Sequence, residues 1–215
     1  MQKTLLQKKI KINPIKNKTM NLLFEIHITT SDLSEKGVEE FEDFCQTIEA
    51  KPIVIELSKG THFRQPMISK VFRCAEGKEI HSKIDQLTQQ FATANYPVSR
   101  VKIEVPLEIE EQAKDIFAAH EKTYFEWHGK LEIQDLQQVK NLCVQHDAHL
   151  SKNSLKKNPK SKFITIRDFQ SADSIRKRVA DLKKDMDGKG WHFDKEEFEY
   201  CIFDSNESLD KGWIG

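Results

Sequence analysis

The sequence repeats itself at a distance of about half its length. The motif Phe-Glu-x-His occurs at residues 24–27 and again at residues 125–128. A helix-type stripe of Ile80, Ile84, Leu87 and Phe91 recurs, 95 residues later, as Ile175, Val179, Leu182 and Met186. Because apolar residues at three- and four-residue spacing form one face of a helix, the two halves are predicted to share one fold.

The first half predicts the order strand, helix, strand, strand, helix, strand. Residues 22–28 alternate, with Phe24, Ile26 and Ile28 on one face and Glu25, His27 and Thr29 on the other. Helices are expected over residues 35–49 and 80–91, and further strands over residues 51–57, 67–74 and 101–105.

The second half repeats these patterns, so the predicted fold is α+β. It is a tandem ferredoxin-like (βαββαβ) repeat, with antiparallel sheets that carry helices on one face. The expected units are a basic flexible arm (1–20), repeat 1 (21–107), a helical linker (108–122) and repeat 2 (123–215). Residues 1–19 are alternatively an extension upstream of a start at Met20.

Composition narrows the classes of partner. The 34 basic and 34 acidic residues cancel, so nucleic-acid binding is not expected. No apolar run reaches the roughly 18–20 residues that span a bilayer, so no membrane association is expected. The four cysteines lie far apart without a C-x-x-C pair, which favours isolated thiols over a metal or disulfide framework. We expect a cytoplasmic protein with no metal and no cofactor, while secretion by a specialised system stays open.

Both copies of Phe-Glu-x-His place a carboxylate beside an imidazole on the face that the helices leave open. These pairs are Glu25 with His27 and Glu126 with His128. A carboxylate raises the pKa of a neighbouring histidine and fixes its tautomer, which suits proton transfer or anion binding. The alternative is that the two halves simply pack through these polar faces.

The connection between the second and third strands, residues 58–66, is a second candidate site. Its donors could surround a phosphate and its aromatic ring could stack on a base. Gly60 permits a positive-φ turn. The alternative is a solvated hairpin tip. The candidate ligand-binding residues of this loop are Lys59, Gly60, His62, Phe63, Arg64 and Gln65.

Two oppositely charged segments suggest a protein partner as a further alternative. Residues 152–167 contain five lysines and one arginine without an acid, and residues 194–210 are rich in acids. Such segments would suit an interaction module.

The His27-Ile28-Thr29 stretch resembles the H-x-T/S signature of two-histidine phosphoesterases. That resemblance implies a general base or acid at His27 and a phosphoryl-oxygen contact at Thr29, with His128 or His149 as the second histidine. The second half departs from the signature, since Gly129 and Lys130 follow His128.

A longer stretch, residues 24–105, resembles the adenine-nucleotide-binding KLAMP domains of bacterial effector proteins. The matching features are Phe-Glu-x-His at 24–27, Cys45, the strand 51–57, and the G-x-x-x-x-Q-P-M pattern in residues 60–67. The resemblance implies a nucleotide with its base stacked on an aromatic ring, for which Phe63 is the nearest candidate. The leading prediction is a module that binds a small anionic ligand such as an adenine nucleotide, without a catalytic set.

Overall fold

The computed structural model describes residues 21–116, 123–187 and 189–213. The first half contains β1 (Leu22–Thr30), α1 (Glu35–Thr47), β2 (Lys51–Leu57), β3 (Arg64–Cys74), α2 (Gly77–Thr93) and β4 (Val98–Pro106). The short helices η2 (Leu107–Ile109) and α3 (Glu110–Ile116) follow. The second half contains β5 (Tyr124–Glu132), α4 (Leu136–Gln145), β6 (His149–Asn153), β7 (Ser161–Asp168), α5 (Ala172–Asp187), β8 (Lys195–Asp204) and η3 (Glu207–Asp210).

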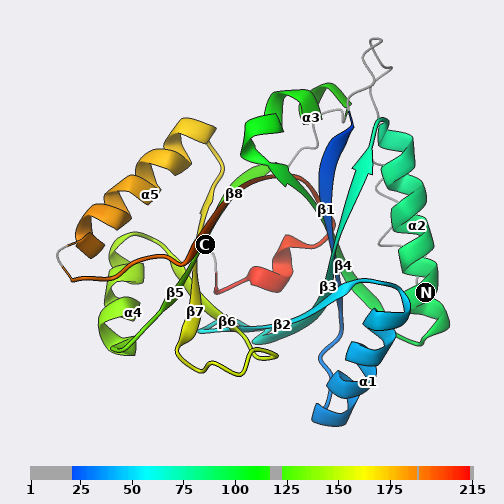
Figure 1. Cartoon of the computed structure of the whole chain (residues 1–215), viewed down its shortest axis with the longest axis horizontal. Helices are drawn as coiled ribbons and strands as arrows, with labels where there is room; N and C mark the ends of the chain where they lie inside the picture. Colours follow the sequence, from blue (N-terminus) through cyan, green and yellow to red (C-terminus); the bar gives the residue numbers. More distant parts are fainter. Residues whose placement is uncertain (1–20, 117–122, 188, 214–215) are drawn as a thin grey trace.

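The expected tandem of two open ferredoxin-like sheets is wrong. The strands form one closed barrel in the order β1-β3-β2-β6-β7-β5-β8-β4, and every neighbouring pair is antiparallel (Figure 1). Each half does have the predicted order of elements. The prediction failed at the sheet edges, where unpaired backbone groups of one half find partners in the other.

Both seams of the barrel join corresponding strands of the two halves. β4 pairs with β8, and β2 pairs with β6. An arrangement in which equal elements meet is the one found in two-fold symmetric dimers. The two halves therefore enclose one shared interior.

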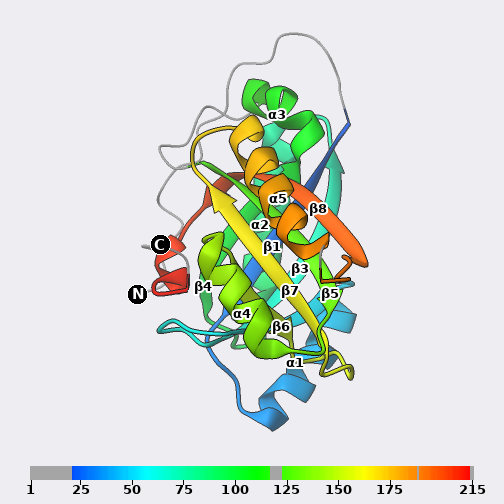
Figure 2. The ribbon, with the colours of Figure 1, turned by 90° about the vertical axis from the view of Figure 1, so that its left-hand side faces the viewer.

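The helices cover the outside of the barrel (Figures 1 and 2). α2 packs on β1, β3 and β4, while α5 packs on β5 and β7. Phe24, Ile26 and Ile28 are fully buried under this layer, as the alternation predicts. The apolar core thus lies between helices and strands, and the polar strand faces turn inward.

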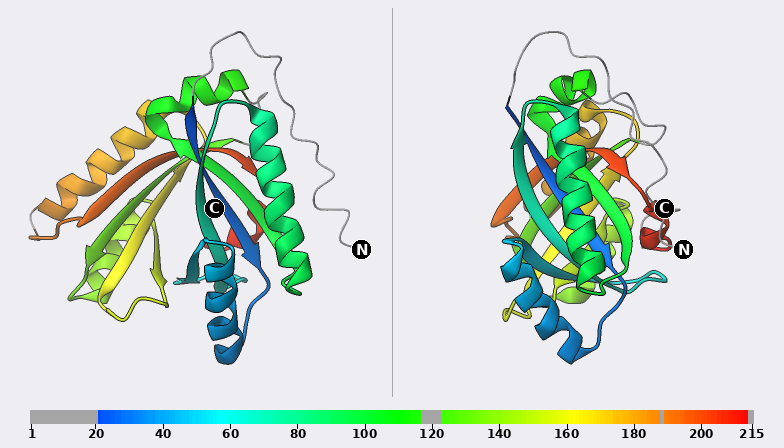
Figure 3. Two further views of the ribbon diagram at one scale, coloured as in Figure 1. Left: turned by 45° about the vertical axis from the view of Figure 1, so that its right-hand side comes forward. Right: turned by 90° about the vertical axis from the view of Figure 1, so that its right-hand side faces the viewer.

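The C-terminal segment covers one end of the barrel. η3 lies across the ring of strands in the end-on view of Figure 1, and the side views of Figures 2 and 3 show it at the edge of the strands. The Asp210 carboxylate accepts hydrogen bonds from Arg100 at 3.0 Å and from Arg167 at 2.8 Å. Arg100 also donates to Asp204. These buried charges are paired, as burial requires.

Packing explains why the two copies differ after their histidines. Gly129 stands where the first half has Ile28. A Cβ at Gly129 would lie 2.3 Å from the Trp127 ring and 2.6 Å from the Phe193 ring. The large Trp127 side chain, at the position of Ile26, therefore takes the space that a side chain at residue 129 would need.

Three further predictions concern features other than the sheet. All four cysteines are free and buried, as their spacing indicates. Among the described residues, none of the helices has the length and apolar character to cross a membrane. The predicted basic arm (1–20) lies outside the described residues, and the predicted linker (108–122) is described only as far as the end of α3.

Candidate functional site

The two Phe-Glu-x-His motifs meet inside the barrel. His27 Nε2 lies 3.1 Å from Glu104 Oε2 and 3.6 Å from Glu25 Oε1. These three residues, Glu25, His27 and Glu104, are called the first triad. The structure thus adds to the predicted Glu-His pair a carboxylate from the neighbouring strand β4.

The second half builds the same arrangement. His128 Nε2 lies 3.4 Å from Glu126 Oε2 and 3.4 Å from Glu199 Oε2. These residues, Glu126, His128 and Glu199, form the second triad. In both halves the added glutamate pairs directly, in strand register, with the glutamate of the motif. The triads are therefore repeat-equivalent.

Glu104 and Glu199 were missed from the sequence, although a signal for them exists. They are 95 residues apart, which is the offset of the repeated helix stripe. Each stands on the last strand of its half, on the face opposite to the apolar residues. Applying the known offset to charged residues would have found them.

The triads differ in the side chain across from the motif glutamate. Arg167 pairs with Glu126 in the register of β5 and β7, and its Nη2 lies 2.6 Å from Glu126 Oε1. Val71 takes the corresponding place across from Glu25. Glu25 instead accepts a hydrogen bond from Ser69 at 2.5 Å. A cation therefore neutralises Glu126, but none does so for Glu25 from β3.

The two triads differ in a second way, which also places a positive charge near Glu126. Lys102 lies across from His27, whereas Glu197 lies across from His128. The Lys102 ammonium contacts Glu126 and lies 2.6 Å from Glu104 Oε1. Lys102 and Arg167 thus both contact Glu126, whereas Glu25 and Glu199 form ion pairs only with histidines among the described residues.

The neighbouring carboxylates keep the two histidines charged. Burial opposes charge on His128, but its contacts with Glu126 and Glu199 outweigh this and raise its pKa to about 10. Burial likewise opposes charge on His27, yet Glu104 and Glu25 raise its pKa overall. The His128 Nδ1 lies 2.9 Å from Thr165 Oγ1, which fixes the orientation of the ring.

The carboxylates themselves divide into two kinds. Burial favours the neutral form of Glu126, but Arg167 and Lys102 hold its pKa well below the usual value. For Glu199, burial and the charge of Glu104 raise the pKa in spite of His128. Glu126 is an ionised part of the framework, whereas Glu199 lies in a field that favours an added positive charge.

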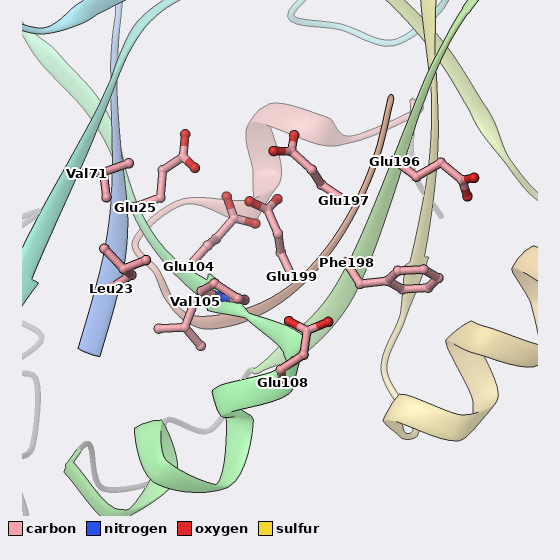
Figure 4. Close-up of a pocket in the computed structure, with 11 residues that line it drawn as sticks. Leu23, Glu25, Val71, Glu104, Val105, Glu108, Glu196, Glu197, Phe198 and Glu199 are labelled. Carbon is pink, nitrogen blue, oxygen red and sulfur yellow. The ribbon is translucent and has the colours of Figure 1, made fainter. Parts of the chain in front are cut away.

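A cavity of about 330 Å³ opens beside the triads (Figure 4). We call it the acidic pocket. Its exposure decreases inward, with side-chain exposures of 49% for Glu197, 30% for Glu25, 14% for Glu199 and 1% for Glu104. Figure 4 shows these four carboxylates directed into the same space. No basic residue is among its described lining residues, which are Leu23, Glu25, Val71, Glu104, Val105, Pro106, Glu108, Glu196, Glu197, Phe198 and Glu199.

The predicted loop site lies away from the acidic pocket. Gln65 and Val71 are on the same strand, and six residues of strand span about 20 Å. Gly60 has φ of +111°, as predicted, and packs against Lys211 and Trp213. The fold therefore separates the candidate residues of the loop at 58–66 from the motif residues Glu25 and His27.

The side chains of the loop fall into two sets, those that hydrogen-bond to the rest of the protein and those that are exposed. Gln65 is buried and donates to Leu209 O at 3.1 Å, and Arg64 donates to Leu33 O at 2.8 Å. Both therefore hold the loop in place. Lys59, His62 and Phe63 are exposed.

Thr29 and His149, which the phosphoesterase resemblance also implies, do not form a cluster with His27. Thr29 is buried two residues beyond His27 on β1, across from Arg100. His149 is buried beside Trp213, with ring centroids 5.5 Å apart. His27 and His128 do share one interior, but Glu104 and Glu199 lie with them and would repel a phosphodiester.

Comparisons with known proteins assign no family. No family model matches the chain, and no curated protein matches it. Among solved structures, the small subunit of acetolactate synthase from Thermotoga maritima has 9% identity and a TM-score of 0.28, covering 82% of this chain and 92% of its own. A candidate chlorite dismutase has 8% identity and a TM-score of 0.31, covering 87% and 98%. A heme-binding protein from Thermus thermophilus has 10% identity and a TM-score of 0.30, covering 90% and 95%. Scores this low support no argument about function.

Proposed function

We propose that the protein is a small-ligand-binding module whose ligand carries positive charge and occupies the acidic pocket. The observation that carries this proposal is the clustering of Glu25, Glu104, Glu197 and Glu199 around one cavity. Its described lining residues include no basic residue, and from outside the lining Lys195 pairs with Glu197 and Lys102 with Glu104. Carboxylates held together in a partly buried space repel one another, so a cation that enters lowers the energy of the site.

The asymmetry between the halves supports a site at this place. Lys102 and Arg167 neutralise the interior around Glu126, which therefore needs no ligand. Val71 and Glu197 stand at the corresponding places beside the pocket. Leu23, Val71 and Val105 add apolar surface, so the lining fits an organic cation with a hydrocarbon body, such as an alkyl amine or a guanidinium compound.

The charge of this pocket opposes the adenine nucleotide expected from the sequence. A phosphate placed among these carboxylates would be repelled at distances where the low dielectric strengthens the effect. The exposed Lys59, His62 and Phe63 of the loop at residues 58–66 lie elsewhere and are tested in the same experiment with AMP.

The experiment is a calorimetric titration of putrescine, spermidine, agmatine and AMP into the protein at low, constant ionic strength. We expect at least one of the cations to bind with one-to-one stoichiometry at the pocket. A ligand present at about 100 times its dissociation constant stabilises the fold by roughly 2.7 kcal/mol, so thermal unfolding gives a second reading.

Two isosteric variants locate the binding. Glu25→Gln removes one pocket charge and is expected to weaken cation binding by about tenfold, or roughly 1.4 kcal/mol. Glu39→Gln makes the same change on the exposed face of α1 and is expected to have no effect. Equal losses in both variants, or binding of AMP alone with loss in Lys59→Ala, would contradict the proposal.

A further inference from the structure

Glu104 and Glu199, which line the acidic pocket, form together with His128 a set of groups suited to a metal ion. Glu104, His128 and Glu199 each offer one ligand atom, and these atoms all lie within 4.8 Å of one another. They come from three strands, β4, β5 and β8, and both triads contribute. Two carboxylate oxygens and one imidazole nitrogen are ligands that first-row divalent transition metals accept.

Two details set this group apart from a simple cluster of acids. Thr165 holds the Nδ1 side of His128, which directs Nε2 at the carboxylates. Such outer contacts orient the histidine ligands of metal sites. Glu104 is 1% exposed, so its carboxylate is held inside the protein, where its Oε1 lies 2.6 Å from Lys102 Nζ.

We propose that Glu104, His128 and Glu199 bind one divalent first-row transition-metal ion, such as Zn²⁺ or Mn²⁺. The carboxylates supply two negative charges and His128 Nε2 supplies a lone pair. His128 binds as the neutral ring, and its Nε2 proton passes to solvent. Glu104 and Glu199 also line the acidic pocket, whose more exposed part is lined by Glu25 and Glu197.

Lys102 limits how the ion is held. Its ammonium contacts both Glu104 and Glu126, so it competes with a metal for Glu104. Glu199 is 14% exposed and contacts His128, so a metal reaches its carboxylate without displacing a lysine, and Glu199 is the stronger anchor. The metal therefore leaves the pair of Lys102 with Glu126 intact.

This inference rests on the proposed function in one respect only, namely that a cation occupies the acidic pocket. Metal-free protein, prepared with a chelator and dialysed, is titrated with Zn²⁺, Mn²⁺ and Mg²⁺ by calorimetry. Binding of Co²⁺ is followed by visible absorption, whose band positions and intensity change when protein groups replace water around the ion. We expect one equivalent of Zn²⁺ or Mn²⁺ to bind more tightly than Mg²⁺, because Mg²⁺ prefers an all-oxygen octahedron.

A matched pair of variants on β8 provides the control. Glu199→Gln removes a ligand and Glu197→Gln removes a neighbouring pocket charge, two residues apart on the same strand face. We expect loss of measurable metal binding in Glu199→Gln. In Glu197→Gln we expect weaker but measurable one-to-one binding, because Glu197 lines the pocket without belonging to the ligand set. Thr165→Val, which frees the His128 ring, is expected to weaken binding by about tenfold. Circular dichroism confirms that each variant is folded.

The outcomes separate the two proposals. Organic cations that bind while no metal binds would overturn the metal site and leave the proposed function standing. Metal that binds equally well to Glu199→Gln would place the ion elsewhere and also overturn the inference. If neither class of cation binds the folded protein, both proposals fail.

Discussion

Val71 and Arg167 occupy equivalent positions in the two halves, each across the strand from a motif glutamate. Arg167 forms an ion pair with Glu126, while Val71 leaves Glu25 without a basic partner on β3. Together with Lys102, which also contacts Glu126, this difference makes the surroundings of Glu126 a charge-paired framework and leaves Glu25 paired with His27 alone among the described residues. The repeat thus provides two copies of one arrangement, of which one is stabilised by charge pairing and the other is open to a ligand.

A positive charge introduced beside Glu25 should weaken cation binding in the acidic pocket. Val71→Arg places a guanidinium beside Glu25, as Arg167 does beside Glu126. Val71 is 53% exposed, so the longer side chain has room. We expect cation binding in the acidic pocket to fall at least about tenfold, measured by calorimetry. Val71→Met is the control for size, and equal binding by the wild type and Val71→Arg would speak against the role of this position.

Removing Arg167 should destabilise the fold. The side chain is 4% exposed and pairs with both Glu126 and Asp210. Arg167→Met leaves two buried carboxylates with less positive charge, which is expected to lower the free energy of unfolding by about 3–5 kcal/mol. Urea denaturation measures this. A loss below about 1 kcal/mol would mean that Lys102 and Arg100 suffice alone.

His149 should make the protein sensitive to acid. Burial lowers the pKa of its imidazole to about 4, below the ordinary value of 6.5 in the unfolded chain. The unfolded chain therefore binds a proton first, so this contribution to stability is complete above pH 6.5 and is lost as the pH falls towards 4. We expect a loss of about 2 kcal/mol between about pH 7 and pH 5 from this group.

The variant His149→Gln isolates that effect. Its stability relative to wild type is measured by urea denaturation across about pH 4–7. The free energy of unfolding of the wild type should fall relative to that of His149→Gln as the pH falls, since only the wild type carries the titrating imidazole. Parallel curves over this range would show that His149 titrates normally.

Gly129→Ala should reveal the close packing behind the second histidine. The new Cβ would overlap the Trp127 and Phe193 rings, so we expect a cost of about 1–3 kcal/mol in urea denaturation. In a Phe193→Ala background one of the two overlaps disappears. The same substitution should then cost less, and an unchanged cost would place the strain elsewhere.

The sequence determined the local structure and the pairing of chemical groups along each strand. Alternation in residues 22–28 placed Phe24 under the helices and His27 on the opposite face, because side-chain direction in a strand depends only on neighbours in sequence. The repeat offsets also contained the equivalence of Glu104 and Glu199.

Only the tertiary structure decided what the polar faces enclose. Backbone pairing of β4 with β8 and of β2 with β6 carries almost no sequence signal, because every strand edge offers the same N–H and C=O groups. That pairing closed the barrel, brought His128 within reach of Glu104, and separated the loop at residues 58–66 from the motif histidines. Residues far apart along the chain thereby form one charged interior, in which glutamates contact histidines, Lys102 and Arg167 from other strands.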